Sequence, residues 1–369
     1  KDGWFSVVGL TDARILLVDD SRMIRLTISK HLRQIGFESI DEADNGAVAI
    51  DLLRTGKNYD LVLLDLEMPG MNGLEFLAKI MALRPTPVII VSGHTGRGAE
   101  VTMEALQIGA FDCYEKPSGH DGNLLAGDGG VLAHSIRLAA RHGARQTSKT
   151  VQRAQLGATA ASPGTGQENA KRLIAIGAST GGVEALTKLL AQWPANCPPT
   201  LIVQHISGAL AKALARRLNT ISPANVALAE SDCFLKPGHV YIAPGNERHL
   251  VVRGRSRLIS QLTVADPVSG HRPSVDVLFE SVASVVQAHA TGILLTGMGE
   301  DGARGLLAMR KAGAETIAQD EATSIVYGMP HAACELGAAN RILPINRFAE
   351  AVFAGAGVTR SATISIACS

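Results

Sequence analysis

Short apolar runs recur through the first half of the chain, and segments with helical spacing separate them. Three of the runs, at 14–18, 61–64 and 88–91, are short and continuous, as in strands that are buried on both faces. Weaker strand patterns lie at 38–43 and 111–115. The strand–helix unit occurs five times, so this half is predicted to form a doubly wound α/β domain with a five-stranded parallel sheet.

Helical periodicity fills the gaps between the apolar runs. One apolar stripe runs from Ile24 to Ile35 and stops at Gly36, a residue that commonly ends helices. A second stripe covers 74–81, and the fifth helix is predicted at 131–142. The intervals between the apolar runs are therefore predicted to form helices.

The second half is again α/β, with less regular spacing. Strands are predicted at 173–176, 200–204, 240–243, 293–296 and 316–318, and helices at 183–192, 275–286, 303–311 and 331–336. The stretch 226–262 is richer in strand patterns and favours hairpins. A second doubly wound domain is expected here, largely parallel with some antiparallel hairpins.

Apolar periodicity disappears between the two halves. The segment 119–130 is polar and rich in glycine, which predicts a loop, and 158–167 consists of small and polar residues. The predicted organisation is a first domain at 13–143, a flexible linker at 144–170 and a second domain at 171–357.

Composition narrows the possible classes of protein. The 369 residues suffice for two domains that each have a core. A net charge of +1 provides no general attraction to nucleic acid or to anionic membranes, and no apolar run reaches the ~18 residues of a membrane span. The five cysteines are odd in number and widely spaced, as expected of reduced thiols in a cytoplasmic protein. Neither nucleic acid nor direct membrane insertion is therefore expected.

Charged side chains follow the apolar runs of the first half. Asp19 and Asp20 end the first strand and Asp65 ends the third, and in an open parallel sheet such strand ends border one crevice. Three carboxylates there suit Mg²⁺, and one of them can act as a nucleophile toward a phosphoryl donor. Lys116 and Ser92, at two further strand ends, could contact the phosphoryl oxygens. Each Asp taken alone could simply cap a helix, but the whole set in this order favours phosphoryl transfer.

Residues 13–143 resemble the receiver domain of two-component response regulators, which has a flavodoxin-like fold. The segment 64–73, Leu-Asp-Leu-Glu-Met-Pro-Gly-Met-Asn-Gly, is very close to that family's phosphoacceptor segment. The resemblance implies that Asp65 is phosphorylated and that Mg²⁺ is held by Asp65, Asp20 and the backbone carbonyl of Glu67, with help from Asp19.

Two further receiver positions match, and one departs. The resemblance implies that Ser92 is the switch hydroxyl and Lys116 the signature lysine. Cys113 stands three residues before the lysine, where the family usually has Tyr or Phe.

The second half contains a different candidate chemistry. Gly177-x-Ser179-x-Gly181, between a strand and a helix, has the spacing of a nucleophile elbow. A glycine-rich turn of this kind also binds dinucleotide phosphates, but the spacing is not GxGxxG, and the next strand ends in His205 where an acid would be needed. His205 could instead remove the serine proton. The carboxylate that orients the imidazole is left open by the spacing, and the candidates are Glu300, Asp301 and Asp320.

Residues 172–354 are similar to the chemoreceptor methylesterase family, CheB. The segment 296–302 resembles its Met-Gly-x-Asp-Gly motif, and the match includes 175–182, 204–205, 241–245, 273–279 and 327–330. Ile206-Ser207 departs from the family's usual Met-Pro.

The resemblance also implies a role for each residue of the site. Ser179 is then the nucleophile, His205 the general base and afterwards the acid, and Asp301 the orienting carboxylate. The oxyanion contacts are implied at the backbone N–H of Met298 and in the region of Thr180.

Together the two resemblances imply a protein-glutamate methylesterase that is activated by phosphorylation. Its substrate would be a glutamate γ-methyl ester on the cytoplasmic region of a chemoreceptor, with deamidation of receptor glutamines as a related reaction. A CheA-type histidine kinase would be the phosphodonor, and ester hydrolysis would need no cofactor. A DNA-binding output is the first alternative, but the second half is long and apolar and has no basic stripe. A catalytically silent scaffold is the second alternative, and methanol release would distinguish it.

Overall fold

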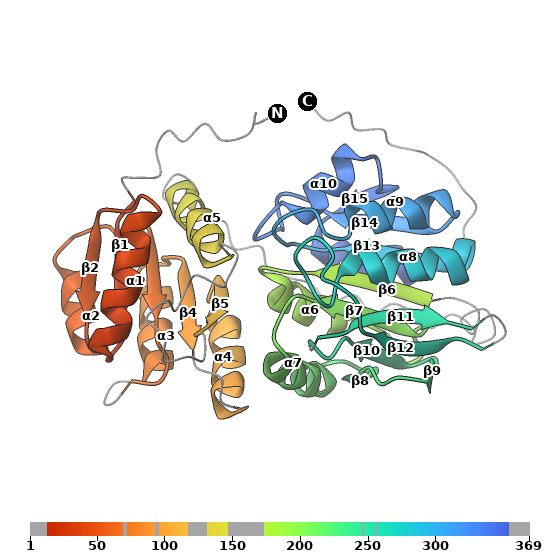
Figure 1. Cartoon of the computed structure of the whole chain (residues 1–369), viewed down its shortest axis with the longest axis horizontal. Coiled ribbons are helices and arrows are strands. Elements are labelled where there is room, and N and C mark those ends of the chain that lie inside the picture. Colours follow the sequence, from red (N-terminus) through yellow and green to blue (C-terminus); the bar gives the residue numbers. More distant parts are fainter. Residues whose placement is uncertain are drawn as a thin grey trace.

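The structure, a computed structural model, describes residues 13–68, 72–92, 96–116, 131–146, 173–245, 247–254 and 257–353. Two α/β halves lie side by side, each built around its own parallel sheet (Figure 1). The predicted fold class is confirmed. The predicted loop at 119–130, residues 147–170 of the predicted linker and residues 171–172 and 354–357 of the second predicted domain lie outside the described residues.

The first sheet has five strands, and every neighbouring pair is parallel. The order β2-β1-β3-β4-β5 is the flavodoxin-like order. The strands are β1 (Ile15–Val18), β2 (Ile40–Ala43), β3 (Leu61–Leu64), β4 (Val88–Ser92) and β5 (Asp112–Glu115).

Helices cover both faces of this sheet, because successive strand residues point to opposite sides. Ile15 and Leu17 of β1 belong to the core that includes α1 and α5, whereas Leu16 and Val18 belong to the core that includes the other three helices. The helices are α1 (Arg22–Gln34), α2 (Gly46–Arg54), α3 (Gly73–Leu83), α4 (Gly96–Ile108) and α5 (Val131–Gln146). Residues 144–146, which were predicted to begin the linker, form the end of α5.

The ends of several helices follow from local sequence. Ser21, Asn45 and Asn72 each accept a hydrogen bond from a backbone N–H of the turn that follows. After α1, Gly36 has a φ of 98°, a left-handed conformation that glycine adopts readily. The predicted stop at Gly36 is confirmed.

The second half contains a seven-stranded sheet whose pairs are all parallel. Its order is β15-β14-β13-β6-β7-β10-β8. The strands are β6 (Leu173–Ala178), β7 (Thr200–Gln204), β8 (Asn225–Leu228), β10 (His239–Ile242), β13 (Ala290–Leu294), β14 (Glu315–Gln319) and β15 (Arg341–Leu343). The chain builds outward from β6 in both directions, so the order reverses beside this strand.

Two helix layers also cover the second sheet. One core joins it to α6 (Gly182–Leu190), α7 (Gly208–Ile221) and α11 (Phe348–Phe353), and the other joins it to α8 (Val275–Val285), α9 (Ala303–Lys311) and α10 (Met329–Glu335). Short 3-10 helices lie at Gln287–His289 and Ile345–Arg347. Helix α7 was not among the elements predicted from sequence, and β13 begins three residues before the predicted strand.

The predicted hairpin region forms a small antiparallel sheet. Its order is β11-β12-β9, and β11 (His249–Arg253) and β12 (Ile259–Thr263) are consecutive antiparallel strands. The third strand is β9 (Cys233–Phe234). Among the helices in the described ranges, none combines the length and apolarity that crossing a bilayer requires.

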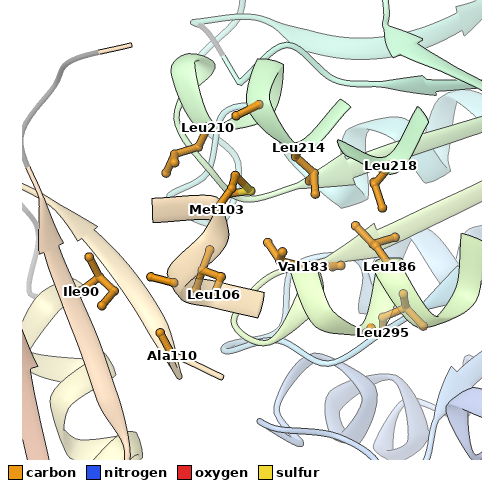
Figure 2. Close-up of a cluster of buried hydrophobic side chains, with 14 of the residues drawn as sticks. Ile90, Met103, Leu106, Ala110, Val183, Leu186, Leu210, Leu214, Leu218 and Leu295 are labelled. Atoms are coloured by element: carbon orange, nitrogen blue, oxygen red, sulfur yellow. The ribbon is translucent and has the colours of Figure 1, made fainter. Parts of the chain in front are cut away.

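The two halves share an apolar interface. Met103 and Leu106 of α4 belong to the same buried core as Val183 of α6 and Leu210 and Leu214 of α7, and Figure 2 shows α4 against these two helices. The interface places β5 and α4 beside the turn that follows β6.

Candidate active site and phosphorylation site

Ser179 lies in the sharp turn between β6 and α6. Its backbone N–H donates to the carbonyl of Thr296 (3.1 Å), and its carbonyl accepts from Gly182 N (2.7 Å) and from Gln204 Nε2 (2.8 Å). β6 is the strand at which the sheet order reverses, and the carboxyl ends of strands at such a point border a ligand crevice. The backbone of Ser179 is therefore held where a ligand site is expected.

The small neighbours of Ser179 are required by close packing. Gly181 has a φ of 77°, and a Cβ there would lie 2.6 Å from Cβ of Ile325. A Cβ at Gly297 would lie 2.8 Å from Cβ of Ser179. These contacts explain why the elbow has glycine beside the serine, as the sequence pattern indicated.

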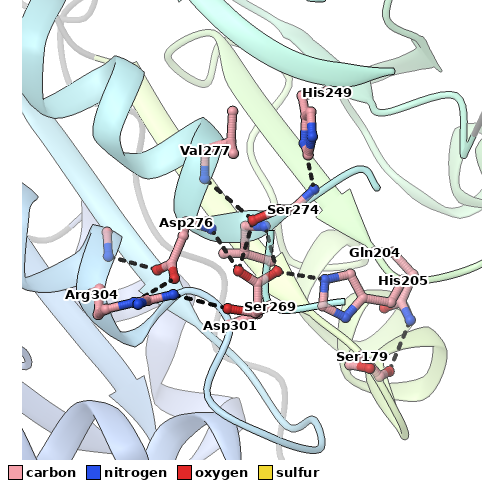
Figure 3. A network of polar contacts seen from close by, with 12 residues as sticks. Ser179, Gln204, His205, His249, Ser269, Ser274, Asp276, Val277, Asp301 and Arg304 are labelled. Atoms are coloured by element: carbon pink, nitrogen blue, oxygen red, sulfur yellow. Dashed lines mark hydrogen bonds and ion pairs between the residues drawn. The ribbon is translucent and has the colours of Figure 1, made fainter. Parts of the chain in front are cut away.

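His205 follows β7, the strand next to β6, and its ring faces a buried carboxylate. Its Nε2 lies 2.9 Å from Oδ2 of Asp301, and the two side chains are only 7% and 1% exposed. Asp301 lies in the loop between β13 and α9, and β13 pairs with β6 on the other side. Three adjacent strand ends thus bring together Ser179, His205 and Asp301, and Figure 3 shows His205 between the other two.

The N-terminus of α8 holds Asp301. Its carboxylate accepts hydrogen bonds from Ser274 Oγ (2.8 Å), Val275 N (2.7 Å) and Asp276 N (3.1 Å), in addition to the contact with His205. Burial raises the pKa of Asp301, but the hydrogen bonds from His205 and from the backbone N–H groups outweigh burial and lower the pKa overall. Because Asp301 is a charged acceptor, Nε2 of His205 must donate to it.

That tautomer leaves Nδ1 of His205 as an acceptor. Among the described residues, this buried nitrogen has no hydrogen-bond partner. It lies on the side of the ring that faces Ser179 (Figure 3). Such an atom can take a proton from a hydroxyl that approaches it.

The alternative carboxylates lie elsewhere. Asp320 accepts hydrogen bonds from the backbone N–H and the hydroxyl of Thr323, and Glu300 is exposed. Among the three candidates left open by spacing, Asp301 is the one that the structure brings to His205. Ser274 and the start of α8 were not assigned a role from sequence, although Ser274 immediately precedes the predicted helix at 275–286.

The predicted oxyanion residues flank Ser179. Thr180 follows it directly, and its carbonyl accepts from Thr296 Oγ1 (3.0 Å). Met298 follows Gly297, whose backbone packs against Ser179. Both residues are placed near the serine, and their role in binding an oxyanion stays a prediction.

The carboxylates of the first half gather at the ends of β1 and β3. Asp19, Asp20 and Asp65 each offer an oxygen, and these oxygens lie within 4.8 Å of one another. Asp19 and Asp65 are buried, whereas Asp20 is exposed. A compact set of hard oxygen donors, one side of which is open to solvent, fits Mg²⁺.

Lys116 completes this cluster. Its Nζ lies 2.8 Å from Oδ2 of Asp19 and 2.8 Å from Oδ2 of Asp65. Burial lowers the pKa of Lys116, but the two carboxylates outweigh burial and raise it overall. Burial also raises the pKa of Asp19, and its hydrogen bond with Lys116 offsets only part of this effect. The lysine therefore stays charged beside the predicted phosphoacceptor.

The remaining predicted receiver positions lie nearby. The backbone N–H of Glu67 donates to Oδ1 of Asp65 (3.2 Å), while its side chain is exposed. Ser92 is the last residue of β4, is buried, and accepts the backbone N–H of Lys116 through its carbonyl (2.7 Å). Residues 69–71 of the phosphoacceptor segment lie outside the described residues.

A small crevice, partly open to solvent, lies between the two halves. Its lining includes Asp112 and Cys113 from β5 and Ser179, Gly181 and Ile325 from the second half. Cys113, the residue that departs from the receiver pattern, therefore faces the same crevice as the candidate nucleophile. Ser179 itself is only 9% exposed and lines this crevice together with residues of the first half.

One hydrogen bond crosses the crevice directly. Oγ1 of Thr180 donates to Oδ2 of Asp112 (2.9 Å), which also accepts from Ser135 Oγ at 3.3 Å. Burial raises the pKa of Asp112, because these hydrogen bonds and that from the Cys113 N–H replace only part of its hydration. A side chain of the first half thus contacts the residue next to Ser179.

Comparisons with known proteins match both halves of the chain. A family model described as CheB methylesterase matches residues 174–352, and one described as response regulator receiver domain matches residues 15–126. The protein-glutamate methylesterase/protein-glutamine glutaminase of Agrobacterium fabrum is 47% identical over 92% of this chain and 95% of its own length. The corresponding protein 1 of Caulobacter vibrioides is 44% identical over 92% of this chain and 96% of its own length.

A solved structure is also similar. The crystal structure of the CheB methylesterase catalytic domain of Thermotoga maritima is 34% identical, with a TM-score of 0.49, and the match covers 50% of this chain and 97% of that chain.

Proposed function

Because the chain belongs to the family of CheB methylesterases that carry a receiver domain, we propose that it hydrolyses glutamate γ-methyl esters on chemoreceptors when it is phosphorylated. The observation that carries the proposal is the meeting of Ser179, His205 and Asp301 at three adjacent strand ends. A hydroxyl, an imidazole and a buried carboxylate in this order are suited to acyl transfer.

The first step is acylation of Ser179. Nδ1 of His205 accepts the hydroxyl proton while Oγ attacks the ester carbonyl, and Asp301 stabilises the imidazolium through Nε2–H. The developing oxyanion lies near Thr180 and the backbone N–H of Met298, where donors lower the barrier. His205 then gives its proton to the departing methanol.

Hydrolysis of the acyl-enzyme restores the site. Water, deprotonated by His205, attacks the acyl carbonyl, the bond to Ser179 Oγ breaks, and His205 returns the proton to Oγ as the glutamate carboxylate leaves. A glutamine amide presents the same acyl group with ammonia as the leaving group. We extend the proposal to deamidation because the relatives are named protein-glutamate methylesterase/protein-glutamine glutaminase.

The first half regulates access to Ser179. Asp65 accepts a phosphoryl group from a CheA-type histidine kinase, and Lys116 contacts its oxygens. Mg²⁺ held by Asp19, Asp20, Asp65 and the carbonyl of Glu67 would neutralise charge on the phosphoryl group. Phosphorylation shifts the population toward an arrangement in which the crevice beside Ser179 is open.

Methanol release from methylated receptor fragments tests the proposal, with and without a small-molecule phosphodonor. The wild-type chain should release methanol faster with the donor. Ser179→Ala should release none under either condition, because the nucleophile is absent. Asp65→Asn should retain the slow basal release and lose the activation, since its amide cannot accept the phosphoryl group.

Two results would contradict the proposal. Methanol release by Ser179→Ala would exclude the serine as nucleophile. Full activation of Asp65→Asn by the phosphodonor would exclude Asp65 as the phosphorylation site.

A further inference from the structure

A second histidine lies flat against His205. The ring of His271 is 3.7 Å from the ring of His205 between centroids, and the two planes differ by 9°. His271 is half-buried, whereas the side chain of His205 is 7% exposed. One face of the candidate general base is therefore covered by a parallel ring.

A tight turn holds His271 in this position. Val268 and His271 exchange two backbone hydrogen bonds (3.1 and 2.9 Å), and the residues between them, Ser269 and Gly270, both have positive φ, as in a two-residue hairpin turn. The tip is tied to α9 because Arg304 donates to Ser269 Oγ (3.0 Å). The position of His271 is thus fixed by the backbone of this turn and by the contact between Arg304 and Ser269, and not by hydrogen bonds of its own ring to other described residues.

Two titratable groups dominate the surroundings of His271, namely His205 and Asp301. Burial and the neighbouring imidazole of His205 lower the pKa of His271 to about 4, and Asp301 opposes this only in part. His271 is then neutral near pH 7. A neutral ring can remain stacked on His205 when His205 takes up a proton, whereas a second imidazolium would repel it.

The contact with Asp301 alone leaves the imidazole incompletely oriented. The hydrogen bond at Nε2 fixes one atom of the His205 ring, but the ring can still tilt about that contact. A flat surface at van der Waals distance opposes the tilt. Since Nδ1 must point at Ser179 to accept its proton, the plane of the ring decides whether transfer occurs.

We propose that His271 is a positioning residue whose stacked ring keeps Nδ1 of His205 aimed at Ser179. The inference rests on the proposed function, because it assigns His205 the role of general base. His271 itself exchanges no proton with the substrate, and its contribution comes from a planar face.

Labelling with a fluorophosphonate tests the inference in the full chain with a phosphodonor present. Ser179 Oγ forms a bond to phosphorus, fluoride leaves, and the serine proton passes to His205. The variants are His271→Phe, which retains a planar face, and His271→Leu, which fills space without one. His289→Ala, at an exposed histidine of the same half, controls for the loss of an imidazole.

The limiting labelling rate should fall about tenfold in His271→Leu while the half-saturating probe concentration stays unchanged, because orientation and not binding is affected. His271→Phe and His289→Ala should stay within about twofold of the wild type. Unfolding temperatures of all variants should be measured, and each labelling reaction should be run well below them. Rescue by Phe is the result that a merely structural role would not produce.

The labelling results distinguish a failure of the proposed function from a failure of the role assigned to His271. An unlabelled Ser179 in the wild-type chain would overturn the proposed function and this inference with it. A labelled wild type with an equal rate in His271→Leu would overturn the inference alone. Equal losses in His271→Phe and His271→Leu would also overturn it, because a planar face would then be insufficient.

Discussion

Asp301 obtains its chemical character from its contacts. Three donors at the N-terminus of α8 and one from His205 keep it ionised in spite of its burial. Asp320 is a strand-end carboxylate too, but the donors to its side chain come from Thr323. At the scale of single residues, hydrogen-bond partners thus distinguish carboxylates that look alike in the sequence.

Asp301→Asn should lower ester hydrolysis by about 10³–10⁴-fold, because an amide no longer holds the tautomer of His205 or stabilises its imidazolium. Asp320→Asn is the matched control and should remain within about twofold. Rates of methanol release for both variants, measured with the phosphodonor, check this expectation. Comparable losses in the two variants would contradict the assignment of Asp301.

At the scale of an element, the turn between β6 and α6 also depends on contacts with distant residues. Its turn needs a left-handed residue at Gly181, and the side chain of Ile325 fills the space where a Cβ would lie. Both requirements act on the segment that carries Ser179. The geometry of this turn is therefore set by the opposing loop as well as by the local sequence.

Gly181→Ala should destabilise the protein by about 1–2 kcal/mol through its left-handed φ, and by about 1–3 kcal/mol more through contact with Ile325. Gly337→Ala is the control, because Gly337 also has a positive φ (62°) but its nearest neighbour, Arg310, would be 3.9 Å from the new Cβ. Denaturant unfolding of both variants measures the difference. Equal losses would show that Ile325 adapts.

At the scale of the whole molecule, two independently built α/β halves meet beside the crevice that Ser179 lines. Helix α4 packs on α6 and α7, and Asp112 of β5 accepts a hydrogen bond from Thr180. The interface also carries an exposed ion pair between Glu100 and Arg216. The part-buried hydrogen bond between Thr180 and Asp112 lies beside the crevice, which makes it the contact most directly linked to Ser179.

Asp112→Ala should raise basal methanol release about fivefold, because loss of a hydrogen bond worth about 1 kcal/mol favours the open arrangement. Activity with the phosphodonor should be unchanged, since the open arrangement lacks this contact. Glu100→Ala removes an exposed ion pair of the same interface and should change basal release by less than about twofold. Equal effects of the two variants would contradict a specific role for Asp112.

Periodicity and strand-end positions were sufficient to predict both parallel sheets. Buried parallel strands are short continuous apolar runs, so β1, β3, β4 and β7 could be found within about one residue. Helix α7 was overlooked, and β13 was predicted three residues late. The start of β13 was missed because Ala290, Thr291 and Gly292 are small or polar, and the continuous run of large apolar residues begins only at Ile293.

Local sequence alone determined which reactive residues end strands, because alternating strands and helices place such residues at one edge of a sheet. Pairing between distant segments decided the rest. Strand order set β13 and β7 on either side of β6, and only this order brings Asp301 and His205 to Ser179. The stacking of His271 and the contact of Asp112 with Thr180 join residues 66 and 68 positions apart, and no local pattern records such contacts.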